Sequence, residues 1–448
     1  MELKKRILVA AAFFSVISLS FAMASENSTL TDDVKKLTQV EEVQEVNNSI
    51  SEKIKQKIEA YAERKGIHFG EVENGRIFTY AIEEVNKSPS DPRFGQSRVV
   101  AFERAWLKAQ KDIASYIGLT IASETIRDFY SNDSEGAENI KVNNWEVFKN
   151  KILGLSEALV NKALEKLGVN PNQYGKLSLE KRKELLHDRL IREIAKKTSA
   201  QLAGTFIVQT FEGEEDGTHA VGVVVMYSPK LKYIANAIAR GYCPTLGKKV
   251  GHPVSYYLPK NPSEYISTWG VRVIIDESGK PALLSFGQWS HPYSGNNKIM
   301  RERNRKYARE KANLLAESYI SEFLNSFILS TEKQKTGEEA IINAAWKDGD
   351  TFVENMDRII DERWEKIKRT SRARISGLRT VTTKLLKLPG GQEVAVAVKF
   401  WNCAGMEGAK ALKKKYTPNT RTKQPTKKVN PEKSYIHQGK DMTEINDF

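Results

Sequence analysis

After its first 24 residues the sequence lacks any long apolar run, and its 448 residues include only two cysteines and six histidines. No later segment approaches the ~20 apolar residues that a membrane-spanning helix needs. The motifs of phosphate loops, serine hydrolases, zinc proteases and paired-cysteine metal sites are absent as well. We therefore expect a non-enzymatic protein, and we predict no catalytic residue, cofactor, metal or small-molecule substrate.

The N-terminus has the layout of a secretory signal peptide. A short basic stretch, Lys4 to Arg6, precedes a mostly apolar run, and Ala22-Met23-Ala24 forms a small-x-small cleavage site. We predict a signal peptide over residues 1–24, cleaved between Ala24 and Ser25. An uncleaved anchor is the alternative, although the run is short for one. Export from a bacterial cytoplasm would place the protein in the periplasm or outside the cell.

The net charge of +14 is concentrated at the C-terminus. Residues 410–433 contain nine basic residues and one acidic residue, together with proline, threonine and asparagine. A segment of this kind buries too little apolar surface to offset the entropy lost on ordering. We therefore predict a disordered basic tail over residues 404–448.

Two segments about two hundred residues apart resemble each other. AWLKAQKDIASYI (105–117) and AREKANLLAESYI (308–320) are identical at six of thirteen positions. In both, apolar residues and alanines recur on one helical face, which predicts a long helix packed closely on a sheet. Arg98 aligns with Arg301, and Tyr116 aligns with Tyr319. The tyrosines are expected to reach the rim of the packed face with their hydroxyl groups.

The segments that follow these helices also match. Leu202 to Tyr227 aligns without a gap to Ile375 to Phe400, at an offset of 173 residues, with the turn residue Gly217 opposite Gly390. Valines alternate along both second strands, a pattern typical of a strand with one buried face. Upstream of each helix, ENGR (73–76) and ESGK (277–280) predict a hairpin turn. We conclude that one unit occurs twice.

We predict an α+β fold of two duplicated two-layer units, each a mostly antiparallel sheet with helices on one face. Each unit is expected to run hairpin, long helix, helical insert, hairpin. The insert is expected to form two amphipathic helices in the first unit and one, roughly 337–368, in the second. The predicted boundaries are a polar leader (25–65) ending in a helix (50–65), a first unit (66–228) with its insert (131–197), a proline-containing linker with a short helix (229–266), and a second unit (267–403).

The order of elements resembles that of a bacterial envelope superfamily. The resemblance rests on a hairpin, an A-x-x-x-A helix ending at an Ile-Gly turn (Ala105, Ala109, Ile117, Gly118) and a closing hairpin. That superfamily includes small outer-membrane lipoproteins and the N-terminal domain of a flagellar T-ring assembly protein. The resemblance implies a scaffold or assembly role with envelope protein partners. The chain departs from the family in its duplication, its large inserts and its lack of a lipid-acceptor cysteine.

Cys243 and Cys403 each follow the closing strand of one unit. In an oxidising compartment they could form a disulfide that joins the units, closing a loop worth roughly 5 kcal/mol in the chain-entropy picture. Two buried free thiols are the alternative.

Basic residues suggest a second type of partner, an anionic polymer or a lipid headgroup. They lie on the second long helix and in the tail: Arg301, Arg303, Arg305, Lys306, Arg309, Lys413, Lys414 and Lys415. Interleaved glutamates, such as Glu302 and Glu310, are also typical of an ordinary solvated helix. A scaffold acting through protein contacts is thus the first hypothesis, anionic-polymer binding is the second, and a hydrolase without a known motif is the third. The oligomeric state is not predicted.

Overall fold

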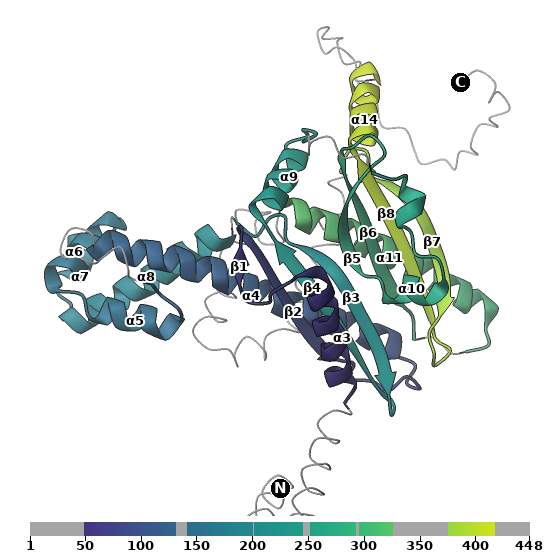
Figure 1. The fold of residues 1–448 in the computed structure, drawn as a ribbon, viewed down its shortest axis with the longest axis horizontal. Helices are drawn as coiled ribbons and strands as arrows, with labels where there is room; N and C mark the ends of the chain where they lie inside the picture. Colours follow the sequence, from purple (N-terminus) through teal and green to yellow (C-terminus); the bar gives the residue numbers. More distant parts are fainter. Residues whose placement is uncertain are drawn as a thin grey trace, which may run out of the picture.

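The computed structural model describes residues 49–130, 141–199, 201–244, 251–292, 295–325 and 375–416. These residues form two four-stranded antiparallel sheets with long helices packed on them, so the predicted α+β class with two sheet units is confirmed (Figure 1). Four predicted features lie outside the described residues: the signal peptide with Ala24 and Ser25, the leader up to residue 48, the insert helix at 337–368, and the tail beyond residue 416. Within the described residues, no helix combines the length and apolarity needed to cross a membrane.

The first sheet has the strand order β1-β2-β4-β3. Its strands are β1 (Val72–Glu73), β2 (Arg76–Glu84), β3 (Phe206–Glu215) and β4 (Thr218–Tyr227). Helix α4 (Phe94–Tyr130) covers one face, and α3 (Ile50–Lys65) covers the other (Figure 1). The predicted helix at 50–65 is therefore part of this unit, and the prediction of helices on one face is wrong for the first sheet, because α3 buries its other face. Its isoleucines pack over Gly222 of β4, which leaves room for them.

The second sheet repeats this order as β5-β6-β8-β7. Its strands are β5 (Gly270–Ile275), β6 (Pro281–Ser290), β7 (Arg379–Lys387) and β8 (Glu393–Asn402). Helix α11 (Lys298–Asn325) packs on it in the place that α4 takes on the first sheet. Gly287 of β6 lies directly under Ala312 and Ala316, where a side chain would meet helix backbone. The alanine face therefore brings helix and sheet together as predicted.

Two irregularities recur at equivalent positions and support the duplication. The register shifts between Ile207 and Gln209 in the first closing hairpin and between Thr380 and Thr382 in the second, at the same offset of 173 residues. The aligned residues Gly204 and Gly377 both have positive φ, of 87° and 85°. Each lies against the first turn of the helix that follows its hairpin. Alternating valines could arise in two unrelated strands by chance. A bulge and a glycine contact that both recur at equivalent positions are better explained by duplication.

The closing hairpins differ at their tips. Asp216 and Gly217 form a two-residue turn with φ of 48° and 76°, as the primed hairpin turns require. The second hairpin is joined by residues 388–392, and its positive φ falls on Gly391, not on the aligned Gly390. The predicted equivalence of Gly217 and Gly390 is therefore wrong. Pairing in the second hairpin is shifted by one residue relative to the alignment: Ile207 pairs with Val225, whereas Thr380 pairs with Lys399 and not with the aligned Val398. The longer turn absorbs this shift.

The helical insert differs from the prediction of two helices. Helix α4 does not end at Gly118 but continues through it to Tyr130, and residues 141–199 add further helices. These are α5 (Trp145–Leu153), α6 (Glu157–Lys166), α7 (Pro171–Tyr174) and α8 (Leu179–Ser199). They form an arm that projects from the first sheet along the extension of α4 (Figure 1). The leucine run at 153–167 is split because Gly154 ends α5 and Ser156 caps α6.

The predicted linker and the start of the predicted tail are ordered helices. The linker contains α9 (Pro229–Ala239), a 3-10 turn (Val254–Tyr257) and α10 (Pro262–Ser267). Pro229 and Pro262 each begin a helix, where proline costs no backbone hydrogen bond. The predicted disorder from residue 404 is wrong for its first part, because α14 (Cys403–Tyr416) is a helix. Helix α14 follows the closing strand of its unit as α9 does in the first.

We predict that Gly204→Ala destabilises the protein more than Gly168→Ala. Both glycines have positive φ, so both substitutions carry similar backbone strain. A Cβ at Gly204 would lie 2.5 Å from the backbone of Leu231 and Lys232, whereas Gly168 faces open space. We expect an extra loss of about 1–3 kcal/mol of unfolding free energy for Gly204→Ala, measured by urea denaturation. Equal losses would show that the close approach of α9 is not required.

Candidate functional site

The two units meet along the edge strands β3 and β5. Arg272 of β5 crosses this junction, and its Nη1 donates to the carbonyl oxygen of Ile207 at 2.9 Å and to that of Trp269 at 2.8 Å. Burial lowers the pKa of Arg272 to about 10, which leaves the guanidinium charged at neutral pH. Thr210 of β3 adds a hydrogen bond from its hydroxyl to the carbonyl oxygen of Ser267, at 2.5 Å. Side chains from both units therefore bond to the backbone of the other unit.

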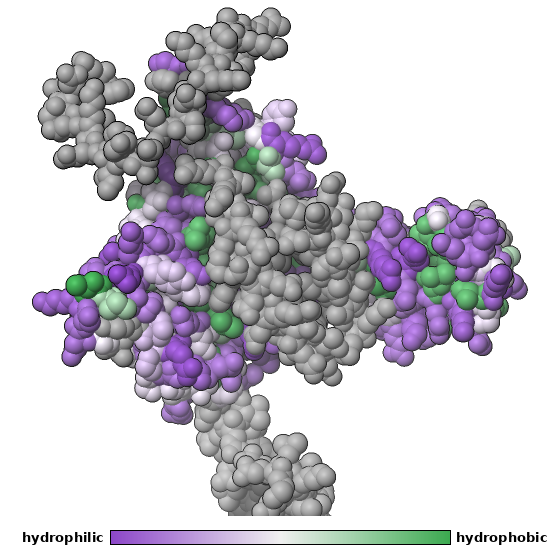
Figure 2. Space-filling view, turned by 180° about the vertical axis from the view of Figure 1, so that it is seen from behind, coloured by the Kyte–Doolittle hydropathy of each residue, from purple (hydrophilic) through white to green (hydrophobic). Residues whose placement is uncertain are grey.

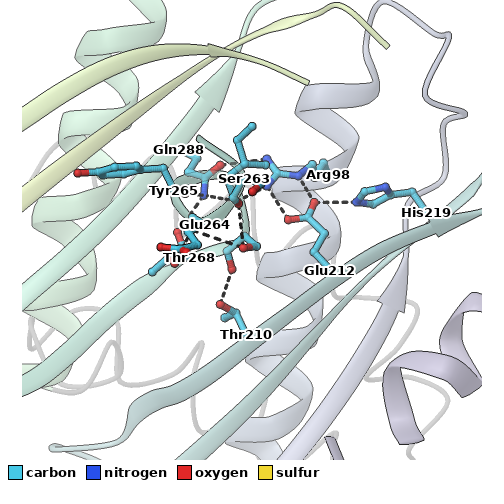
Figure 3. Close-up of polar contacts among 11 residues, drawn as sticks. Arg98, Thr210, Glu212, His219, Ser263, Glu264, Tyr265, Thr268 and Gln288 are labelled. Carbon is cyan, nitrogen blue, oxygen red and sulfur yellow. Dashed lines mark hydrogen bonds and ion pairs between the residues drawn. The ribbon is translucent and has the colours of Figure 1, made fainter. Parts of the chain in front are cut away.

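A second arginine crosses the junction in the opposite direction (Figure 3). Arg98 of α4 is fully buried, and its Nη2 donates to Glu212 of β3 at 2.6 Å. Its Nη1 donates to Oε1 of Gln288, in β6 of the second unit, at 3.0 Å, and its Nη2 also donates to the carbonyl oxygen of Ile266. The guanidinium carbon lies 4.5 Å from the centre of the Trp269 ring. Arg98 thus binds both units at once.

The partners of Arg98 are themselves held in place. Gln288 Nε2 donates to the carbonyl oxygens of Ile266 at 2.7 Å and Thr268 at 2.9 Å, which fixes the segment that leads into β5. His219 Nε2 lies 2.7 Å from Oε1 of Glu212. Burial opposes ionisation of Glu212, yet Arg98 and His219 outweigh burial and hold the pKa of this carboxyl below its usual range. The buried pair is therefore charged at neutral pH.

Chemically, this cluster is suited to hold the units together. The side chain of Arg98 is 0% exposed, that of Glu212 is 5% exposed and that of His219 is 7% exposed, so a substrate has no direct access to them. Tyr319 adds to the junction by donating to Oε1 of Glu103 on α4, at 2.8 Å. The predicted position of the Tyr319 hydroxyl at a rim is wrong, because this residue is buried between α11 and α4. The cluster gives the hydrolase hypothesis no support.

The sequence contains a signal for this buried cluster in the position of Arg98. Arg98 occupies the same helical face as Phe94, Phe102, Ala105 and Ala109, all of which are fully buried. A charged residue in the middle of an apolar helical face requires a buried partner. The partner itself was not predictable, because Glu212 lies on β3, more than a hundred residues away.

The structure brings Cys243 and Cys403 to disulfide-bonding distance, with Cα atoms 5.7 Å apart. Cys243 follows α9, and Cys403 begins α14. Lys410 of α14 also donates to the carbonyl oxygen of Gly241, at 2.5 Å. The bridge therefore ties together the closing helices of the two units, at the end of the second sheet away from the β7–β8 turn.

One edge of the first sheet is left open. Strand β1 pairs only with Arg76 and Ile77 of β2, and the backbone N–H of Gly70 donates to the carbonyl oxygen of Phe78 at 3.1 Å. Along residues 79–84, no backbone from the described parts of the chain pairs with this outer edge. Alternate residues of an antiparallel strand direct their backbone groups to the same side. The N–H and C=O groups of Tyr80 and Ile82 therefore face the same open side as the carbonyl of Phe78.

A pocket of about 520 Å³ lies beside this edge, between β2, α4 and the start of the helical arm. Its lining combines aromatic rings with polar side chains: Phe69, Gly70, Thr79, Tyr80, Asp112, Ser115, Tyr116, Leu119, Asn143, Asn144 and Trp145. Burial raises the pKa of the Asp112 carboxyl, and Lys111 and Lys108 partly offset this effect. Sequence reasoning missed the pocket because its walls come from three separate segments.

The predicted basic residues do not form one surface. Arg305 is bound by Glu393 and Glu302, and Arg301 donates to the carbonyl oxygen of Gly295. Of the predicted basic residues on α11, Arg303, Lys306 and Arg309 are exposed, as are the apolar side chains of Ile299 and Met300 and the ring of Tyr307. Figure 2 shows hydrophobic residues among hydrophilic ones at this end of the molecule, opposite the helical arm. Lys413, Lys414 and Lys415 are exposed on α14, at a different end of the second sheet (Figure 1).

The described residues bring His68, Glu71 and Glu73 together as potential metal ligands, with atoms within 4.8 Å of one another. His68 and Glu71 are exposed, and Nδ1 of His68 lies 2.5 Å from Oε1 of Glu73. This contact explains why the pKa of His68 is raised. An exposed ion pair accounts for the arrangement without a metal ion.

Comparisons with known proteins support the fold. Residues 145–240, from the helical arm through α9, match a domain of unknown function (DUF6844). A crystal structure of hypothetical protein FTT1539c from Francisella tularensis is similar, with 23% identity and a TM-score of 0.50. The similarity covers 79% of this chain and 92% of that chain, and at this identity it shows the fold alone. The comparison with curated proteins found no match.

We predict that Glu212→Gln lowers the unfolding free energy at pH 7 by about 3–5 kcal/mol, because it leaves Arg98 charged and buried without its counter-ion. The matched control is Glu393→Gln, which breaks a more exposed pair with Arg305 and should cost about 1 kcal/mol or less. Urea denaturation of both variants measures the difference.

The pH dependence follows from the lowered pKa of Glu212. The folded protein releases this proton more readily than the unfolded chain, whose glutamates titrate near pH ~4.3. The stability from Glu212 is thus present above that pH and is lost as the pH falls through the lower folded pKa. Below pH ~4 the stability of the unaltered protein should fall more steeply than that of Glu212→Gln. Parallel curves would contradict the assignment.

Proposed function

We propose that the chain is an exported, non-enzymatic envelope protein that acts as a scaffold or assembly module through contacts with other proteins. The observation that carries this proposal is the open outer edge of β2. The two units are fixed to each other at their junction, so this edge has a defined position in the molecule. The layout of the N-terminus, the resemblance to envelope assembly proteins and the close cysteine pair support export.

A scaffold needs fixed geometry, and the junction favours it. Arg98 and Arg272 each require groups from both units, so separating the units would expose a charged network and leave its members without partners. The neighbouring ends of α9 and α14 are tied at Cys243 and Cys403. A partner bound to one unit would therefore be held at a defined position relative to the other unit.

The open edge favours strand addition as the mode of binding. An extended segment of a partner would accept and donate hydrogen bonds at Tyr80 and Ile82, and its alternate side chains would face α3 and α4. The far end of β2 is less suited to strand addition, because Glu83 points inward and pairs with Lys108. Inward-pointing charges of this kind limit edge pairing. The binding segment should therefore be short, centred on residues 79–82.

A second candidate, binding of an anionic polymer or lipid headgroup, rests on the exposed Arg303, Lys306 and Arg309 of α11. The separation of these residues from Lys413–Lys415 reduces the charge available at any one surface. Binding through so few phosphate contacts would be weak and strongly dependent on salt.

We predict that a photo-reactive phenylalanine analogue at Tyr80 cross-links one defined set of envelope proteins in intact bacteria. The same analogue at Tyr256, which is 65% exposed in the second unit, should not capture that set. Ile82→Pro should abolish capture, because proline removes an N–H that faces the open edge and leaves the pairing with β4 intact. Ile82→Ala is its control, because it shortens the same side chain and keeps the N–H. Mass spectrometry identifies the captured proteins and shows whether the mature chain begins at Ser25.

Capture that persists in Ile82→Pro would reject strand addition at β2. Capture of nucleic acid, glycan or lipid that disappears at high salt, with no protein set, would reject the scaffold proposal and favour the basic face of α11.

A further inference from the structure

The pocket beside β2 has the size and chemistry of a ligand site. Its volume, about 520 Å³, lies within the ~300–1,000 Å³ typical of sites for small molecules. The wall on α4 is made by Asp112, Ser115, Tyr116 and Leu119, which recur at the spacing of one helical face. The opposite wall comes from Phe69 and Gly70 and from Thr79 and Tyr80 of β2.

Two aromatic residues contribute rings on the α4 side of the sheet, Tyr116 and Trp145. Tyr116 lies against Gly70, whereas the rings of Phe69 and Tyr80 pack together, with centres 4.7 Å apart, against the isoleucines of α3 on the other face of the sheet. Trp145, at the start of the arm, donates from Nε1 to Oγ of Ser115 at 3.3 Å. This bond holds the indole over the pocket. The faces of such rings are electron-rich and attract a cation that lies over them.

Asp112 is the acidic residue of the pocket lining. No hydrogen bond to its carboxylate is seen among the described residues, although Lys108 and Lys111 lie near enough to favour its charged form. Lys108 is itself held by Glu83. A partly buried carboxylate without a donor gains free energy when a cation or a strong donor approaches it.

We infer that this pocket binds an organic cation, an ammonium or guanidinium group whose charge lies at Asp112 and whose alkyl stem packs between Tyr116 and Trp145. A carboxylate next to two aromatic rings provides both the ion pair and the cation–π attraction that favour such a group. A neutral ligand of the same shape would leave the carboxylate without a partner. An anion would be repelled by it.

The cation has two possible sources with the same chemistry. It is either a free alkylamine-like molecule or a lysine or arginine side chain of a polypeptide that lies along β2. The inference does not depend on the proposed scaffold function, because the pocket would bind a free cation even if no strand adds to β2.

We predict that butylammonium binds the full mature protein in the millimolar range and that n-pentanol, of similar length and without charge, binds at least about fivefold more weakly. Fluorine NMR of protein labelled with 5-fluorotryptophan measures binding through the resonance of Trp145, which Trp145→Phe identifies. Asp112→Asn should weaken butylammonium binding about fivefold or more, and Asp112→Glu should restore part of it.

The matched control is Glu124→Gln. It removes the same charge from an exposed position on the same helix, outside this pocket, and should leave binding unchanged. Thermal unfolding of every variant checks that the fold is retained. Equal binding of butylammonium to Asp112→Asn and to the unaltered protein, or equal binding of butylammonium and n-pentanol, would overturn the inference.

A second titration identifies the source of the cation. It uses the blocked pentapeptide Thr-Val-Lys-Val-Thr and its analogue with norleucine in place of lysine. Binding of the lysine peptide at least about tenfold tighter than butylammonium, lost in the analogue, supports a polypeptide ligand. Equal affinity of the lysine peptide and butylammonium supports a free small molecule. Failure of both to shift Trp145 rejects the site and leaves the strand-addition proposal to its own cross-linking test.

Discussion

The burial of Arg98 is the constraint on which the arrangement of the two units depends. A guanidinium cannot shed its proton in a protein, so its charge must be met wherever the fold places it. Here the charge is met by Glu212 of the first unit and by oxygen atoms of Gln288 and Ile266 on the side of the second. A buried charge of this kind adds little net stability when complete and costs several kcal/mol when broken, about 3–5 in measured cases. The buried charge of Arg98 therefore determines how the two units dock and adds little to the stability of the protein.

Duplication supplied two copies of each helix, and equivalent residues have since taken different roles. Arg98 and Arg301 align, yet the first is buried at the junction and the second donates to the carbonyl oxygen of Gly295 near the surface. Tyr116 and Tyr319 align too. Tyr319 is buried against Glu103, whereas Tyr116 opens onto the pocket beside β2. One residue of each pair, Arg98 and Tyr319, thus lies at the junction, whereas Arg301 and Tyr116 lie away from it.

Periodic features of the sequence predicted the fold well. The alanine-spaced helical faces and the helix at 50–65 occur as expected, because each depends on contacts between one helix and its own sheet. The alternating valines located β4 and β8, but the prediction of one buried face is wrong, because both strands are buried on both faces. Features that depend on distant residues were not predictable. The pairing of Arg98 with Glu212, the walls of the pocket and the packing of α14 join segments that are remote in the sequence. Basic composition alone suggested disorder after residue 404, but Met406 and Cys403 are buried and hold the first turns of α14.

The position of the pocket follows from the same geometry as the junction. Because β3 and β5 face each other, β2 with its short neighbour β1 lies at the outer side of the first sheet. Helix α4 reaches both places: its first turns carry Arg98 into the junction, and residues 112–119 form a wall of the pocket. Its extension carries the arm, whose Trp145 closes over that wall. One continuous helix thus links the fixed core of the molecule to the surface where we place its binding activity.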